Sequence, residues 1–260
     1  ADAATGAADQ AHDGASRISK AIDDQLEHVP NLTPDQITAA AGTLGTPVRI
    51  DRTNLHPAGV YGRGMAPFFF GIALWVFGLF AYLFLRPVSP RALAGRTRSI
   101  GIAVGGWLPA AGLGTVAALV LYGVVDLALG LDPLHPAATI ALLVLAAGSF
   151  VAVDHLLRTT LGVVGDVLSL VLLVLQLTAS GGLYPMPTTP GFFQALHPVL
   201  PMTYLVDGLR VTISGGLTGH LLRDATALGV FMVGCLVLSA FAARRQRVWT
   251  VARLHPDVEL

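Results

Sequence analysis

Five long apolar runs constrain the fold of this chain more than any other feature. They cover about residues 65–85, 100–129, 136–157, 160–178 and 217–243. A helix rises 1.5 Å per residue, so the 21 residues of the first run reach about 30 Å, the thickness of a bilayer's hydrocarbon core. Only 12% of the residues are charged, against about 25% in an ordinary soluble domain. The sequence therefore predicts an all-α, polytopic membrane protein with five transmembrane helices in the lipid bilayer.

Three of these runs carry features that shape the predicted helices. The second contains Pro109 and Asp126, so its helix is expected to tilt, to kink at Pro109 or to end before Asp126. The third and fourth runs are almost contiguous, which predicts a tight helical hairpin. The last run is interrupted near its start by Arg223 and Asp224.

The segment 180–216 lies between the fourth and fifth runs and is neither a clean span nor an ordinary polar loop. Its prolines predict two short helices, Gly191–Leu196 after Pro190 and Met202–Ile213 after Pro201. Both are too short to cross a bilayer, so we expect an outer re-entrant or interfacial helical hairpin that acts as a gate or lid.

The second of these short helices divides into two faces. Leu205, Leu209 and Ile213 form one apolar stripe, and Asp207 and Arg210 are spaced to pair elsewhere on the helix. Aromatic side chains of the segment suit a membrane interface. The candidate residues of the outer segment are Tyr184, Pro190, Phe192, Phe193, Pro201, Tyr204, Asp207 and Arg210.

The arginines predict the orientation, because cytoplasmic loops are enriched in positive charge. With a cytoplasmic C-terminal tail (244–260), the outer segments between spans hold one arginine, Arg210. The inner segments hold nine: Arg86, Arg91, Arg96, Arg98, Arg158, Arg244, Arg245, Arg247 and Arg253. Arg49, Arg52 and Arg63 of the N-terminal region lie outside in this scheme, but long domains translocate largely regardless of charge. We expect a multi-pass protein of the bacterial cell membrane with an extracytoplasmic N-terminal segment.

Residues 1–64 are polar and predict the end of a helical extracytoplasmic domain. Apolar residues in 11–29 follow a helical spacing as a narrow stripe that Pro30 ends, and the pattern from Thr33 to Gln36 predicts the capped start of a second helix. A flexible linker is the alternative. Because the orientation places these residues outside, we expect an upstream membrane helix and a larger external domain in the full protein.

Four polar residues cluster at the hairpin between the third and fourth runs. They are Asp154, His155, Arg158 and Asp166. Asp154 and Arg158 are four residues apart and can pair on one helix face. A salt-bridged hairpin end that fixes packing and a polar lining of a transport path are both open. A paired-aspartate intramembrane protease is disfavoured, because Gly165-Asp166 lacks the glycine that such a motif needs two positions earlier.

The remaining short patterns indicate structure more than chemistry. Leu-His-Pro occurs at 55–57, 134–136, 196–198 and 254–256, where His-Pro marks a helix boundary; a metal site or proton relay is the alternative. Small residues four apart, Gly101/Gly105 and Gly165/Ser169, allow close packing of helices, within the chain or against a second copy.

No sequence pattern supports an enzyme. Walker-type, nucleophile-elbow, zinc and dinucleotide motifs do not occur, and Lys20 is the single lysine. We expect no catalytic residue, cofactor or metal site. The net charge of zero gives no basic field for nucleic acid.

The loop at 86–98 is short and basic. Its arginines are Arg86, Arg91, Arg96 and Arg98, and Ser89-Pro90 predicts a small helix at 90–95. It is either a plain positive-inside loop or a docking helix for a cytoplasmic partner.

Ordered motifs over residues 45–245 resemble a known family. Ser180-Gly181-Gly182, Pro190-Gly191-Phe192-Phe193 and Asp207-Gly208-Leu209-Arg210 resemble the C-terminal signature of type-2 ABC exporter permeases, in particular the YhgE/Pip (phage infection protein) branch. Asn54-Leu55-His56-Pro57 and Gly64-Met65-Ala66-Pro67-Phe68-Phe69 are similar to the start of that branch's membrane block.

The resemblance implies a six-span permease with a large external domain after its first span. Loop 86–98 would then take the place of the coupling helix that contacts a separate ATPase. The first hypothesis is therefore a permease subunit of an ABC-type exporter that acts as a homodimer or pseudo-dimer. Its substrate is unknown, and the low charge of the spans favours an amphipathic one. The same branch includes phage receptors and a secretion-system membrane component. A non-transporting envelope protein that acts through its external domain is therefore the second hypothesis.

Overall fold

The computed structural model describes residues 2–27, 33–38 and 62–247. The chain divides into two units, Ala1–Asn54 and Leu55–Leu260. The predicted stop at Pro30, the Leu-His-Pro triplets at 55–57 and 254–256, and the tail beyond 247 lie outside the described residues.

The first unit contains the two helices that the sequence predicts. Helix α1 covers Asp2–Glu27, and residues 34–38 form the start of a second helix. The Gln36 amide donates to Thr33 Oγ1 (3.3 Å) while the Thr33 amide donates to Gln36 Oε1 (3.0 Å), which is the reciprocal capping box. The predicted helix start at Thr33 is confirmed.

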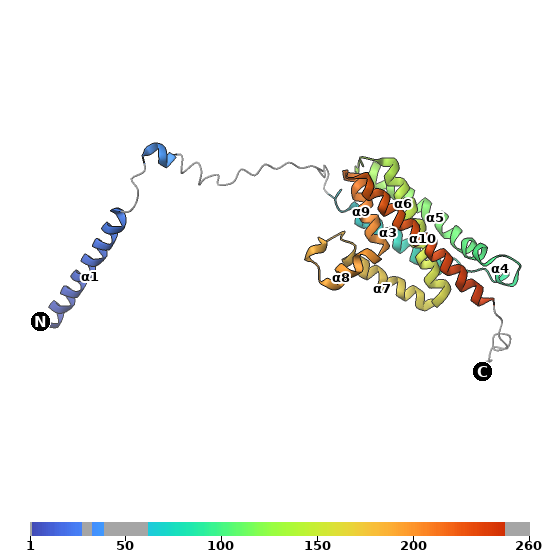
Figure 1. Cartoon of the computed structure of the whole chain (residues 1–260), viewed down its shortest axis with the longest axis horizontal. Coiled ribbons are helices and arrows are strands. Elements are labelled where there is room, and N and C mark those ends of the chain that lie inside the picture. Colours follow the sequence, from blue (N-terminus) through green and yellow to red (C-terminus); the bar gives the residue numbers. More distant parts are fainter. Residues whose placement is uncertain (1, 28–32, 39–61, 248–260) are drawn as a thin grey trace. The chain divides into compact units, whose positions relative to one another are not determined.

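The second unit is a bundle of helices (Figure 1). Four of them are long and apolar enough to cross a membrane: α3 (Ala66–Phe84), α5 (Ser99–Leu127), α6 (Pro136–Leu161) and α10 (Thr218–Gln246). No strand occurs in the described ranges. The all-α, polytopic membrane class is therefore confirmed.

The predicted number of five full spans is wrong by one. The fourth run forms α7 (Val163–Ala179), whose 17 residues reach about 26 Å. It is short because α6 continues to Leu161 and the chain then turns at Gly162, which has a positive φ of 61°. Four long apolar helices and one shorter apolar helix replace the five spans.

Helix α5 continues past both Pro109 and Asp126. It ends at Leu127, so among the alternatives expected for this run, an end before Asp126 is wrong. The Asp126 carboxylate accepts hydrogen bonds from the Tyr122 hydroxyl (3.2 Å) and the Asp132 amide (3.1 Å). These partners allow a carboxylate in the last turn of the helix.

Helix α6 lies at the centre of the bundle, in contact with α3, α5, α7, α10 and α9 (Pro201–Ser214). Its Phe150 ring packs on Trp75 of α3 with ring centroids 5.2 Å apart, and both side chains are fully buried. The small residues Gly101 and Gly105 were expected to mediate close packing, but a Cβ at Gly105 would meet nothing within 4 Å and one at Gly101 only the Thr97 methyl.

The outer segment forms the two predicted short helices, α8 (Gly191–Leu196) and α9. The apolar stripe of α9 is confirmed, since Leu205, Leu209 and Ile213 are all 0% exposed. Helix α9 packs on α3, α6 and α10. It is thus part of the hydrophobic core rather than a cover laid over it.

Candidate functional site

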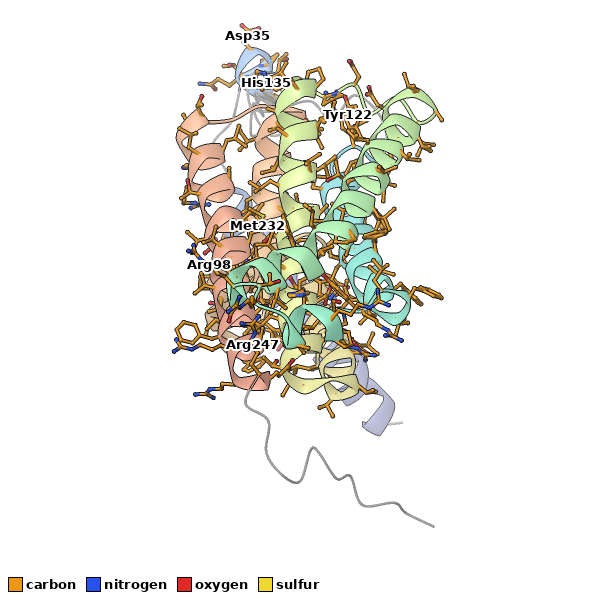
Figure 2. The ribbon with its side chains drawn as sticks, turned by 90° about the vertical axis from the view of Figure 1, so that its right-hand side faces the viewer. Asp35, Arg98, Tyr122, His135, Met232 and Arg247 are labelled. Atoms are coloured by element: carbon orange, nitrogen blue, oxygen red, sulfur yellow. The ribbon has the colours of Figure 1, made fainter. Side chains whose placement is uncertain are left out.

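Hydrogen bonds between distant segments define two ends of the membrane bundle. At one end, the Gln246 side chain donates to the Thr159 carbonyl (2.7 Å), which joins the end of α10 to the end of α6. At the other end, the amides of Leu134 and His135 donate to the carbonyls of Ile213 (3.1 Å) and Thr212 (2.9 Å). Figure 2 shows Arg98 and Arg247 toward the first end and Tyr122 and His135 toward the second. We call the first the basic end.

The loop 86–98 lies at the basic end and carries α4 (Pro90–Ala94). The helix predicted after Ser89 is therefore confirmed. All four arginines of the loop are exposed, namely Arg86, Arg91, Arg96 and Arg98. The loop presents cationic side chains around one short helix.

Arg247, at the end of α10, holds this loop from one side. Its guanidinium donates to the Ala92 carbonyl at 3.2 Å and also to the Thr97 carbonyl. A planar guanidinium with several fixed donors suits this bridging of two carbonyls. The loop is thereby joined to the last helix of the bundle.

His155, on α6, holds the loop from the other side. Its Nε2 lies 2.8 Å from the Pro87 carbonyl oxygen and its Nδ1 lies 3.1 Å from Ser239 Oγ of α10. A carbonyl only accepts, so Nε2 carries the hydrogen. The imidazole is 0% exposed and packs against the Tyr82 ring at 5.5 Å. His155 therefore connects the loop, α6 and α10.

Gly106 of α5 leaves the room that this connection needs. A Cβ built there would overlap the Pro87 carbonyl oxygen and lie 2.8 Å from His155 Nε2. Sequence reasoning grouped His155 with Asp154 and Arg158 and did not connect it to the loop. The pairing depends on contacts 68 residues apart that spacing does not show.

The four polar residues of the hairpin split into separate interactions. Arg158 pairs with Asp166 across the turn, and Asp154 accepts a hydrogen bond from the Ser169 hydroxyl. The pairing of Asp154 with Arg158 that their spacing allows does not form, because α7 offers each side chain another partner. Asp154 is 4% exposed, and its Oδ2 packs on Gly78 of α3 with no hydrogen-bond partner in the described part of the chain.

The pair across the hairpin is expected to stabilise the fold. Its side chains are 24% and 17% exposed, so removing either charge leaves the other partly buried and alone. We expect Arg158→Ala or Asp166→Ala to cost about 1–3 kcal/mol, with a coupling of about 1 kcal/mol or more in the double-mutant cycle. Unfolding in mixed detergent micelles measures both.

The Asp207–Arg210 pair of α9 provides the control. Its charged atoms lie 3.3 Å apart, but the side chains of Asp207 and Arg210 are 32% and 43% exposed. The coupling energy between them is therefore expected to stay below about 0.5 kcal/mol. Equal couplings for the two pairs would contradict a stabilising role for the hairpin pair.

Hydrogen bonds hold the outer segment together and join it to α7. Arg210 donates to the Gly181 carbonyl (2.6 Å) besides pairing with Asp207, and the Tyr204 hydroxyl donates to the Pro198 carbonyl (2.7 Å). His197, expected to mark a helix boundary with a metal site or proton relay as the alternative, lies 2.6 Å from the Ala179 carbonyl through Nδ1.

The other candidates of this segment differ in exposure. Tyr184 and Phe192 are 57% and 64% exposed. Phe193 is half-buried, Pro190 exposed and Pro201 buried. The segment therefore has an exposed aromatic edge and a buried helical base.

No residue set in the described ranges brings three or more His, Cys, Asp or Glu side chains together. The Leu-His-Pro triplets that are described mark helix boundaries: His135 precedes α6, and His197 follows α8.

The long apolar helices are connected by segments that carry the short surface helix α4 and the buried helix α9. This arrangement defines a multi-pass α-helical membrane protein. The chain belongs to the ABC-2 type transporter family, whose model matches residues 49–214. This confirms the resemblance that the sequence motifs showed. Members of this family are membrane components of transporters, not classical enzymes.

A curated relative supports the same assignment. The chain is 31% identical over 199 residues to the "Uncharacterized protein YhgE" of Bacillus subtilis (strain 168). The match covers 74% of this chain but 25% of the relative, so the chain spans about a quarter of that protein's length. No solved structure matches the chain.

Proposed function

We propose that this chain is the permease unit of an ABC-type exporter and that a separate cytoplasmic ATPase docks on loop 86–98. The observation that carries the proposal is the double anchoring of a short cationic loop. His155 holds its first part and Arg247 its second, so the loop is fixed to α6 and α10. Family membership supports an ATP-binding partner, since ABC-2 membrane components work with one.

The anchors also give the loop a means to act on the bundle. If the ATPase displaced α4, the movement would be transmitted to α6 through His155 and to α10 through Arg247. Because α6 contacts five other helices, a shift there reaches most of the membrane unit. A loop that served only to fix orientation would need no such connections.

The rest of the proposal follows from the same frame. The basic end faces the cytoplasm, as the positive-inside rule favours. Two copies form the working permease, and the apolar spans favour an amphipathic substrate.

Reversing two of the loop charges tests the docking site. We expect Arg91→Glu with Arg96→Glu to lower co-purification of a nucleotide-binding subunit, identified by mass spectrometry and ATP hydrolysis, by about tenfold or more, because like charges at an interface cost several kcal/mol. Arg244→Glu with Arg245→Glu is the matched control, since both arginines are exposed at the same end but outside the loop.

Two results would argue against the proposal. Equal loss in both double variants would point to a general charge effect at this end. A stable native complex that contains no ATP-hydrolysing subunit would favour an envelope scaffold instead.

A further inference from the structure

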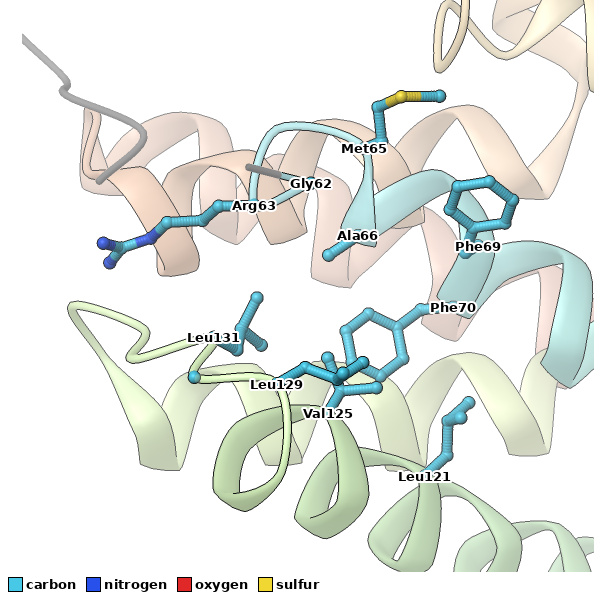
Figure 3. A pocket seen from close by; sticks show the side chains of 11 residues that line it. Gly62, Arg63, Met65, Ala66, Phe69, Phe70, Leu121, Val125, Leu129 and Leu131 are labelled. Carbon is cyan, nitrogen blue, oxygen red and sulfur yellow. The ribbon is translucent and has the colours of Figure 1, made fainter. Parts of the chain in front are cut away.

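A cavity of about 360 Å³ opens at the end of the bundle opposite the basic end, between the start of α3 and the end of α5 (Figure 3). Its floor is formed by Phe70 and Leu131, which are 2% and 3% exposed. Its rim includes Phe69 and Leu129, which are 57% and 66% exposed. The volume lies within the usual range of ligand pockets, about 300–1,000 Å³. The cavity is thus apolar, closed below and open toward the surface of the bundle.

One cationic side chain lines this apolar cavity. Arg63 donates to the Ile213 carbonyl at 3.0 Å and to the Asp132 carbonyl, and its Nε is buried and has no hydrogen-bond partner among the described residues. Figure 3 shows its side chain extending away from Phe69, at the side of the cavity where Leu131 lies. Arg63 forms no ion pair with any side chain of residues 62–247.

The acidic groups nearby do not neutralise this guanidinium. Asp126 accepts from Tyr122 and from the Asp132 amide, and Asp132 meets Arg63 through its backbone carbonyl. Two neutral carbonyls orient the guanidinium, and no acidic side chain within 62–247 pairs with its charge. Nη2 makes both hydrogen bonds to these carbonyls, so Nη1 is the group left to donate to a phosphate or carboxylate oxygen, as a charge-assisted hydrogen bond.

We infer that this cavity binds an anionic lipid of the surrounding bilayer, with one acyl chain against Phe70 and Leu131 and the headgroup phosphate on Arg63. The position of Arg63 fits, because it lies three residues before α3 begins, where a helix enters the headgroup region. The exposed rim lets the chain enter sideways from the bilayer. The inference does not depend on the proposed ATPase, since the cavity lies at the other end of the bundle.

Lipid retention by the purified protein tests this site. The protein is reconstituted in nanodiscs with equal amounts of phosphatidylglycerol and phosphatidylcholine of identical chains, extracted in mild detergent and weighed by native mass spectrometry. We expect about tenfold preference for phosphatidylglycerol, and Arg63→Gln should bring the ratio close to one. Arg210→Gln, at an arginine already paired with Asp207, should keep the preference.

A second variant tests whether the lipid binds inside the cavity. Val125→Trp fills the cavity from its α5 wall and should lower retention of both lipids while Arg63 stays intact. This variant keeps the test decisive if Arg63→Gln does not fold. Equal retention of the two lipids by the native protein, an unchanged preference in Arg63→Gln, or no effect of Val125→Trp would each overturn the inference. So would a protein segment found in the cavity.

Discussion

Replacing Gly106 with alanine is expected to release loop 86–98 and to raise its cleavage by trypsin at Arg91 and Arg96 by about tenfold or more. The added Cβ would overlap the Pro87 carbonyl oxygen, a backbone atom that cannot turn aside as a flexible side chain can. Overpacking of this kind costs about 1–3 kcal/mol. The hydrogen bond from His155 to Pro87 adds about 1 kcal/mol when it is lost. Cleavage follows the population of the open loop, and each 1.4 kcal/mol changes it about tenfold.

The neighbouring glycine supplies the matched control for this experiment. A Cβ at Gly105 would meet nothing within 4 Å, so Gly105→Ala makes the same chemical change in the same helix without the collision. It should leave the cleavage rate unchanged and add up to about 1 kcal/mol of helix stability. Similar cleavage of the two variants would show that Gly106 does not hold the loop in place.

Trp75→Ala is expected to destabilise the membrane unit by about 3–5 kcal/mol, measured by unfolding in mixed detergent micelles. Trp75 is 0% exposed, packs on Phe150, and donates from Nε1 to the Ser169 carbonyl at 3.2 Å. The substitution therefore leaves a cavity among α3, α6 and α7 and removes the hydrogen bond from the indole to α7. Trp75→Phe keeps most of the packing and should cost about 1–2 kcal/mol.

Phe80→Ala provides the comparison on the same helix. Phe80 is 52% exposed, and lipid can fill the space that its ring leaves. Its loss should cost less than about 1 kcal/mol. If the two alanine variants were equally stable, the contact of α3 with α6 would not hold the bundle together.

Hydrophobic length predicted most of the helices, because a bilayer requires long uncharged runs and prolines mark where short helices start. The bounds of α3, α8 and α9 lie within two residues of those expected. The length of the apolar run did not predict the length of α7, because a turn at Gly162 shortens this helix and hydrophobicity gives no sign of that turn. The end of α5 was also not predictable, since the partners that allow Asp126 in the helix appear only once α5 and the following loop are folded.

The candidate site was predictable in its location but not in its connections. Charge counting placed four arginines on one loop, and the structure exposes all four. The anchors come from His155 and Arg247, 68 and 155 residues from the groups they bind. Gly105 and Gly106 of α5 are adjacent and chemically identical, but only Gly106 lies against the loop. This difference appears only once the loop is packed on α5.

The burial of α9 restricts how the end opposite the loop can open. Nine of its 14 residues are buried, and its Gly208 lies against Leu142 of α6 and Asp224 of α10. A flap that swung outward on a hinge would have to tear these contacts apart. An opening at this end that kept these contacts would have to move α9 together with α6 and α10, and so would widen the mouth of the bundle rather than lift a cover from it.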